Sequence, residues 1–249
     1  YGIKDIIGIR YGYLGLSKKS RHEPIKMTLK SIDQIHKQGG TVLGSSRGNQ
    51  DPVDMVNQLV SRKINLLYCI GGDGTLKGAK AIAEEIKSRN LSISVVGIPK
   101  TIDNDLSFIE KTFGFETSVQ IASDIITSAY TEAVGAENGI GIVKLMGRDS
   151  GFISASATLA NSVVDFCLVP ETKFHLHGHG GLLTALERRL KERQYSVIVV
   201  AEGAGQDLFM NTAERRDQSG NVLKEDIGTF LKREIEEHFA DRKLEASIK

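Results

Sequence analysis

The chain has 249 residues, of which 40% are hydrophobic and 25% are charged, as in ordinary globular proteins. This composition excludes a disordered tail, a collagen-like repeat and a small disulfide-linked scaffold. Lys plus Arg number 32 and Asp plus Glu number 31, which gives a formal net charge of +1. Proteins that bind nucleic acid through its phosphates usually have a basic excess, so we expect a small-molecule partner and no nucleic acid.

The apolar segments are short. None approaches the ~20 consecutive apolar residues that span a bilayer, so no membrane partner is expected. The two cysteines, Cys69 and Cys167, lie inside apolar runs. They are interpreted as buried thiols in a reducing compartment, which favours the cytoplasm, with a plastid or glycosome-like organelle as the alternative.

Strand-like runs alternate with amphipathic helical patterns along the chain. In chain order the patterns predict strand 3–9, helix 24–38, strand 41–44, helix 51–62, strand 64–70, helix 75–89, strand 93–98, helix 112–137, strand 140–145, helix 150–162, strand 164–169, helix 181–192, strand 197–201 and helix 227–239. Residues 64–70 and 93–98 are nearly continuously apolar, which is typical of strands covered on both faces. This alternation favours an α/β fold with mainly parallel sheets and helices on both faces.

The first motif is the segment Gly71-Gly72-Asp73-Gly74-Thr75, between a predicted strand and a predicted helix. Glycines allow close approach of a ligand to the backbone, and a helix N-terminus favours a phosphate. A carboxylate in such a loop is understandable with a cation, and Mg²⁺ prefers one or two carboxylates together with phosphate oxygens. A plain tight turn is the alternative.

The second motif, PKTIDND at residues 99–105, also follows a predicted strand. In open α/β sheets, ligands bind at the carboxyl ends of strands. Asp103 and Asp105 are two residues apart, so in an extended loop both carboxylates point to the same side. Such a pair suits a division of labour in which one carboxylate helps to organise a metal and the other accepts a proton. A polar surface turn is the alternative.

Together the motifs resemble the 6-phosphofructokinase family. GGDGT at 71–75, PKTIDND at 99–105, MGR at 146–148 and AEG at 201–203 have the order and spacing seen in that family. GGDGT alone is a weak signal because NAD kinases and lipid kinases carry similar loops, whereas the combination is specific. Flanking segments resemble the plant-like and kinetoplastid-like ATP-dependent members.

The resemblance implies a two-lobed, three-layer α/β/α phosphofructokinase-like fold. Residues 1–137 are expected to form part of a nucleotide-binding lobe and residues 138–249 part of a sugar-phosphate-binding lobe. The family's N-terminal strand and loop precede the position of Tyr1, and its C-terminal segment follows Lys249. The fold is therefore expected to be incomplete at both termini.

The implied reaction is phosphoryl transfer from MgATP to the C1 hydroxyl of fructose 6-phosphate, giving fructose 1,6-bisphosphate in glycolysis. Asp103 matches the general base and Asp105 an acid that supports the base and the metal. Thr101 matches a contact of the transferred phosphoryl group, and Arg148 a cation that stabilises its charge. Lys100 is included among these catalytic positions.

The resemblance also divides the binding residues between the two substrates. Asp73 matches the acid that organises Mg²⁺. The positions expected to bind ATP and Mg²⁺ are Tyr13, Arg47, Gly72, Asp73, Gly74, Thr75 and Gly78. The positions expected to bind fructose 6-phosphate are Thr101, Asp103, Met146, Gly147, Arg148 and Glu202. A homo-oligomer, either a tetramer or a dimer, is expected by resemblance only.

The phosphoryl donor depends on Gly74 and Lys100. ATP-using members keep glycine at the position of Gly74, which leaves room for the α-phosphate, whereas pyrophosphate users commonly place aspartate there. Lys100 instead favours pyrophosphate as the donor, because pyrophosphate users carry lysine at that position. ATP is favoured, since a carboxylate beside an α-phosphate clashes directly. A pyrophosphate-dependent enzyme and a non-catalytic regulatory subunit that binds sugar phosphates are the alternatives.

Overall fold

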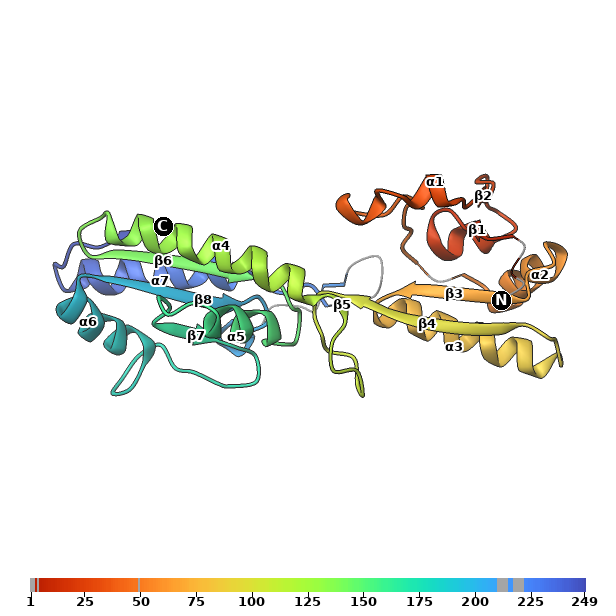
Figure 1. Cartoon of the computed structure of the whole chain (residues 1–249). Helices are drawn as coiled ribbons and strands as arrows, with labels where there is room; N and C mark the ends of the chain where they lie inside the picture. The colour runs from red at the N-terminus through yellow and green to blue at the C-terminus, as the bar shows by residue number, and fades with distance from the viewer. Residues whose placement is uncertain (1–2, 4, 49, 210–214, 217–221) are drawn as a thin grey trace. The chain divides into compact units, whose positions relative to one another are not determined.

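The computed structural model describes all residues except 1–2, 4, 49, 210–214 and 217–221 (Figure 1). The chain divides into two compact units, the first of which extends to Ile98 while the second begins at Pro99. The sequence placed the boundary at residue 137, but the long helix α4 (Phe115–Val134) packs against β6 (Gly139–Leu145) and α5 (Phe152–Leu159). It therefore groups with the second unit. The division of ligand binding between residues 1–137 and 138–249 stays a prediction.

The first unit is built around two helices that pack on one side of a short sheet. Its elements are β1 (Ile7–Gly8), η1 (Gly12–Leu16), β2 (Ile25–Lys26), α1 (Leu29–Ile32), η2 (Ile35–Lys37), α2 (Pro52–Ser61), β3 (Leu66–Gly71), α3 (Asp73–Ser88) and the start of β4 (Ser94–Thr101). Asp51 caps α2 by accepting a 3.1 Å hydrogen bond from the Val53 N–H. Buried side chains from η1, α2, β3 and α3 form one core, which includes Leu16, Leu59 and Ile82.

The N-terminal segment differs from the sequence prediction. Residues 24–38 were predicted as a helix, but they form β2, α1 and η2, and α1 buries no residue. Leu29 is 86% exposed, so the apolar spacing has no core to pack against. The predicted strand 3–9 is reduced to β1, which pairs with β2, and residues 41–44 form no strand. Helical spacing of apolar residues does not produce a long helix in this segment, because no core covers the apolar face.

The sheet of the first unit is covered on one face rather than two. Leu67 and Cys69 of β3 are buried, whereas Tyr68 and Ile70 are 55% and 61% exposed. Side chains alternate along a strand, and in the part of the chain that the structure describes α2 and α3 cover the Leu67 face. The prediction that both faces are covered is therefore wrong for β3.

The second unit is a three-layer α/β/α sandwich. Its elements are the end of β4, β5 (Phe113–Gly114), α4, β6, α5, β7 (Phe166–Leu168), α6 (Leu182–Arg193), β8 (Tyr195–Ala201), η3 (Gln206–Leu208), α7 (Ile227–Asp241) and β9 (Ser247–Ile248). The sheet has the order β7-β8-β6-β9, and every neighbouring pair is parallel. The expected α/β class with mainly parallel sheets is confirmed.

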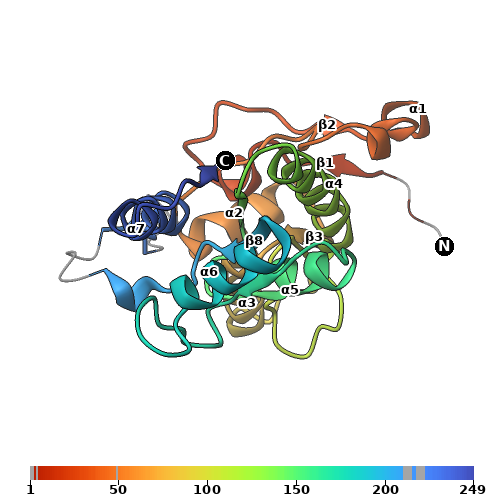
Figure 2. The same ribbon diagram turned by 90° about the vertical axis from the view of Figure 1, so that its left-hand side faces the viewer.

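Alternation along β8 explains the layers of the second unit. Val197 and Val199 pack with α4 and α5, whereas Ile198 and Val200 pack with α6 and α7. Figure 1 and Figure 2 show the four helices around the sheet. All four valine and isoleucine side chains have no exposed surface. The predicted helices and strands from 112 onward are present with boundaries shifted by a few residues, whereas β5, η3 and β9 in the described part of the chain were not predicted.

Cys69 is buried as expected, whereas Cys167 is only half-buried, and neither forms a disulfide. Burial raises the pKa of both thiols. Among the described residues, no helix is both long and apolar enough to cross a membrane.

Candidate functional site

The first candidate loop joins β3 to α3. β3 ends at Gly71, Gly72 precedes the helix without a side-chain cap, and Asp73 is the first helical residue. The first N–H groups of a helix have no partner within it and favour an anion. The Asp73 side chain is 52% exposed and forms an ion pair with Lys77 over 2.7 Å. The loop thus presents a helix N-terminus without a side-chain cap and one accessible carboxylate.

The glycines of this segment differ in how much space the surrounding atoms leave for a side chain. A Cβ atom at Gly71 would lie 2.3 Å from the Thr75 hydroxyl, and one at Gly78 would lie 2.4 Å from the Tyr13 ring. At Gly74 a Cβ would meet no heavy atom of neighbouring segments within 4 Å, and its φ is not in the left-handed region. The chain's own packing therefore requires Gly71 and Gly78 but does not require Gly74.

Tyr13 holds the start of α3. Its hydroxyl donates a 2.5 Å hydrogen bond to the carbonyl oxygen of Thr75, and its ring lies over Gly78. Burial raises the pKa of Tyr13, with a further contribution from the neighbouring Cys69 thiol. The structure therefore brings together three of the residues expected on the nucleotide side. Arg47 belongs to the same unit and is exposed.

The second candidate loop follows β4 and carries the predicted base. The Thr101 hydroxyl donates to Oδ2 of Asp103 over 3.0 Å, and the Asp103 N–H donates to the same hydroxyl over 3.2 Å. Thr101 is buried, Asp103 is half-buried, and Lys100 and Asp105 are exposed. The carboxylate of Asp103 is thus fixed on one side by a buried hydroxyl.

The electrostatic surroundings of Asp103 favour a proton-accepting role. Burial is the main cause that raises the pKa of its carboxyl above the ordinary value. The Asp105 and Glu202 carboxylates raise the pKa further, whereas the Thr101 hydrogen bond and the Arg148 guanidinium oppose the rise. A carboxylate with a raised pKa is a stronger base than an ordinary aspartate.

Asn104 braces this loop, a function that the sequence analysis missed. It adopts the left-handed backbone conformation, with φ of 54°. Its side-chain oxygen accepts hydrogen bonds from the N–H and hydroxyl of Thr112 over 2.8 and 3.2 Å. Asparagine tolerates this conformation better than most residues, so its place between two aspartates was a signal that could have been used.

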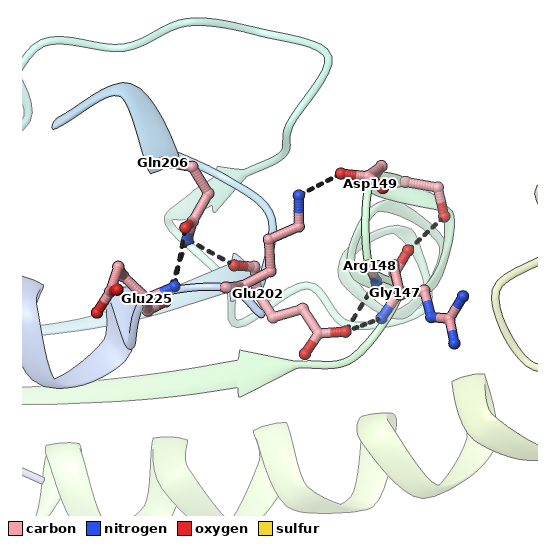
Figure 3. A network of polar contacts seen from close by, with 8 residues as sticks. Gly147, Arg148, Asp149, Glu202, Gln206 and Glu225 are labelled. Atoms are coloured by element: carbon pink, nitrogen blue, oxygen red, sulfur yellow. Dashed lines mark hydrogen bonds and ion pairs between the residues drawn. The ribbon is translucent and has the colours of Figure 1, made fainter. Parts of the chain in front are cut away.

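The third candidate loop, residues 146–148, follows β6 and is held by Glu202 at the end of β8. One carboxylate oxygen of Glu202 accepts the N–H groups of Gly147 and Arg148 over 3.1 and 2.8 Å (Figure 3). Gly147 and Arg148 have positive φ of 142° and 53°. A Cβ at Gly203 would lie 2.0 Å from the Arg148 carbonyl oxygen, so this glycine allows the two strand ends to approach.

Glu202 is itself positioned by residues that sequence reasoning did not single out. The Gln206 amide donates to the Glu202 and Glu225 carbonyl oxygens over 3.0 and 3.1 Å, and it accepts the Glu225 N–H over 2.9 Å (Figure 3). Lys224 forms an ion pair with Asp149. Gln206 and Glu202 are only four residues apart in sequence, whereas the Gln206–Glu225 and Lys224–Asp149 pairs are 19 and 75 residues apart, so no local pattern predicts them.

The second unit therefore assembles several of the expected sugar-side residues. Asp103, which is hydrogen-bonded to Thr101, interacts electrostatically with Arg148 and Glu202, while Met146 is 63% exposed. Among the described residues, no group of three or more His, Cys, Asp or Glu side chains forms a metal site by itself.

Comparison with known proteins relates the whole chain to curated sequences. An ATP-dependent 6-phosphofructokinase of Borreliella burgdorferi is 48% identical over 255 residues, and ATP-dependent 6-phosphofructokinase 7 of Arabidopsis thaliana is 50% identical over 251. Both alignments cover 100% of this chain. The ATP-dependent 6-phosphofructokinase of Trypanosoma cruzi is 48% identical over 236 residues and covers 95% of it.

The chain spans about half the length of these relatives, namely 57%, 51% and 48% of them respectively. Among solved structures, a pyrophosphate-dependent phosphofructokinase from Marinobacter aquaeolei matches with a TM-score of 0.76 and 21% identity, covering 99% of this chain and 59% of that one. At this identity the likeness shows the fold alone. The phosphofructokinase family model matches residues 1–248, and the chain therefore belongs to the phosphofructokinase family.

Proposed function

We propose that the protein is an ATP-dependent 6-phosphofructokinase, which transfers the γ-phosphoryl group of MgATP to the C1 hydroxyl of fructose 6-phosphate. The observation that carries this proposal is the environment of Asp103. Its half-buried carboxylate accepts a hydrogen bond from Thr101, and burial raises its pKa. The positive charge of Arg148 interacts favourably with the ionised carboxylate. This is the environment that a general base for a sugar hydroxyl needs.

In the proposed reaction, the C1 oxygen forms a bond to the γ-phosphorus as the bond between that phosphorus and the β,γ-bridging oxygen breaks. ADP leaves with the electron pair, and Asp103 takes the hydroxyl proton. The products are ADP and fructose 1,6-bisphosphate. Arg148 is proposed to stabilise the charge on the transferred group, because such reactions depend mainly on positioning and electrostatic stabilisation. Met146, Gly147 and Glu202 are proposed to bind the sugar phosphate.

The choice of ATP rests on Gly74 and on the relatives. The open space at Gly74 is not explained by packing within the chain, and it suits an α-phosphate at the N-terminus of α3. The named relatives at 48–50% identity are ATP-dependent enzymes. A pyrophosphate-dependent enzyme is the second candidate, because pyrophosphate users carry lysine at the position of Lys100. Tyr13, Arg47, Gly72, Thr75 and Gly78 are proposed to line or support the donor site.

Magnesium fits the donor loop through Asp73. The side chain is half-exposed at a helix N-terminus that attracts phosphate, and Mg²⁺ usually combines one or two carboxylates with phosphate oxygens. When bound, the cation would reduce the negative charge of the transferred group. Asp73 would then exchange its exposed ion pair with Lys77 for the metal. Such exposed pairs contribute at most about 1 kcal/mol, so the exchange is not costly.

Assembly and location rest on family resemblance. We propose a homo-oligomer, either a tetramer or a dimer, in the cytoplasm. One Arabidopsis relative, 49% identical over 253 residues, is named chloroplastic, so a plastid is the alternative location. Light scattering on the purified protein and imaging of a tagged copy in cells test these two statements.

A donor assay tests the function. The full-length protein is incubated with fructose 6-phosphate and Mg²⁺, and ATP and pyrophosphate are offered separately while fructose 1,6-bisphosphate is measured. We expect product with ATP and little with pyrophosphate. The reverse preference would establish the second candidate. No turnover with either donor, combined with calorimetric binding of fructose 6-phosphate, would instead establish a regulatory subunit.

A further inference from the structure

The Ser150 side chain contacts the backbone of two different loops. Ser150 immediately precedes Gly151, the N-cap residue of α5. The cap residue is a glycine, so no side-chain hydrogen bond caps α5. The Ser150 hydroxyl lies 3.0 Å from the carbonyl oxygen of Asp103 and 3.0 Å from that of Gly147. Both atoms are acceptors, so the single proton of the hydroxyl is shared between them in a three-centre hydrogen bond.

The two carbonyl groups belong to different loops. Asp103 lies in the loop after β4, and Gly147 lies in the loop after β6. The Ser150 N–H also donates to the Gly147 carbonyl over 2.9 Å, so Ser150 is anchored to the second loop by its backbone. From that anchor its hydroxyl reaches the first loop. Ser150 is only 6% exposed, so water has little access to compete for these bonds.

The anchor is rigid because its other side is also held. Glu202 binds the N–H groups of Gly147 and Arg148, and Gln206 holds the Glu202 carbonyl (Figure 3). A continuous series of hydrogen bonds therefore runs from Glu202 through Gly147 and Ser150 to Asp103. Thr101 holds the Asp103 side chain, but it is the last residue of β4, only two residues before Asp103, and its bond does not join that loop to residues 146–148.

We propose that Ser150 is a positioning residue that ties the backbone of Asp103 to the loop 146–148, so that the base keeps its place relative to the bound sugar. This inference rests on the proposed function, in which Asp103 is the base and that loop binds fructose 6-phosphate. The Ser150 hydroxyl is buried and contacts backbone carbonyl oxygens, so Ser150 would act through Asp103 rather than on the substrates themselves. Its loss should therefore affect turnover and the sugar more than ATP.

Ser150→Ala tests the inference in the full-length protein. The hydroxyl is removed and no new atom is added, so the fold should survive. A misplaced catalytic group commonly costs on the order of 10- to 100-fold, and we expect kcat to fall by that amount. The KM for ATP should stay within about twofold of wild type, because the ATP contacts are untouched. Ser154→Ala is the matched control, since Ser154 is buried in α5 and its hydroxyl has no hydrogen-bond partner among the described residues.

A second pair of variants separates the hydroxyl from packing effects. Ser150→Thr and Ser150→Val have nearly the same shape, and only the first keeps a donor. We expect Ser150→Thr to retain more kcat than Ser150→Val at equal melting temperature. The inference is overturned if Ser150→Ala keeps the wild-type kcat, if Ser154→Ala loses as much, or if the threonine and valine variants are equally active. A wild-type protein without phosphofructokinase activity would refute the proposed function instead.

Discussion

The Thr101 hydroxyl donates a 3.0 Å hydrogen bond to Oδ2 of Asp103, while the Asp103 N–H donates to the Thr101 hydroxyl oxygen over 3.2 Å. A hydroxyl has a single proton, and in this conformation Thr101 donates that proton to the carboxylate of Asp103. Thr101 was expected from the sequence to contact the transferred phosphoryl group. The geometry adds another task, which is to orient the carboxylate proposed to be the base.

Asp103→Asn should nearly abolish turnover and preserve substrate binding. The amide has the size of the carboxylate but cannot accept the hydroxyl proton, and loss of a general base typically costs about 10²- to 10⁴-fold in rate. Steady-state kinetics of the full-length protein give kcat, and calorimetry gives the affinity for fructose 6-phosphate. Asp124→Asn, an exposed position on α4, is the control and should behave as wild type. A near-normal kcat in Asp103→Asn would exclude Asp103 as the base.

The acidic limb of the pH–rate profile should respond to Asp105. The base must be ionised, so activity falls as pH drops through the pKa of Asp103, which burial and the Asp105 charge raise above its ordinary value. Asp105→Asn removes one of the charges that disfavour ionisation. The acidic limb of kcat/KM should therefore move to lower pH. A limb that stays in place or moves to higher pH would contradict this assignment.

Gly78→Ala and Gly74→Ala should have opposite effects on stability. The added methyl group at Gly78 would lie 2.4 Å from the Tyr13 ring, and overpacking of this kind typically costs about 1–3 kcal/mol. At Gly74 the methyl group meets nothing, and alanine is favoured over glycine in a helix by roughly 0.5–1 kcal/mol. Thermal unfolding of both variants measures the difference. Equal melting temperatures would show that Tyr13 does not pack on Gly78 as described.

The helices and strands that bury a face were predictable from sequence, and the others were not. The patterns that predicted α2, α3, α6 and α7 have apolar side chains at helical spacing that are buried in the structure. The segment 24–38 has similar spacing, but its side chains stay exposed. Periodicity shows that a face exists, and only tertiary structure decides whether something covers it.

The same distinction holds for the candidate site. Asp73, Gly74 and Asp103 lie in local motifs whose chemistry is visible in the residues themselves. The support given by Ser150 and Glu202 is invisible locally, since each bonds backbone groups 47 to 55 residues away. Only the structure shows that the Ser150 hydroxyl, just before α5, contacts the Asp103 carbonyl oxygen.

Gly74→Asp should impair the use of ATP selectively. The new carboxylate would enter the open space that we assign to the α-phosphate, and it would repel that phosphate. Two unit charges about 4 Å apart interact by about 4 kcal/mol at an effective dielectric constant near 20, which corresponds to roughly a thousandfold loss of affinity. Lys77 lies three residues further along α3 and would offset part of the repulsion. Pyrophosphate has no third phosphate group, so its use, where present, should be spared.

Steady-state kinetics of the full-length Gly74→Asp protein with each donor measure this effect. Gly74→Asn is the matched control because it adds nearly the same volume without the charge. We expect a loss of kcat/KM for ATP in both variants, with a larger loss for Gly74→Asp, because only that variant adds electrostatic repulsion to the steric conflict. Equal losses of kcat/KM in the two variants would mean that the size of the side chain, and not its charge, explains the glycine at position 74. An unchanged kcat/KM for ATP in Gly74→Asp would mean that the nucleotide does not pass over Gly74, and the choice of ATP would then lose its structural support.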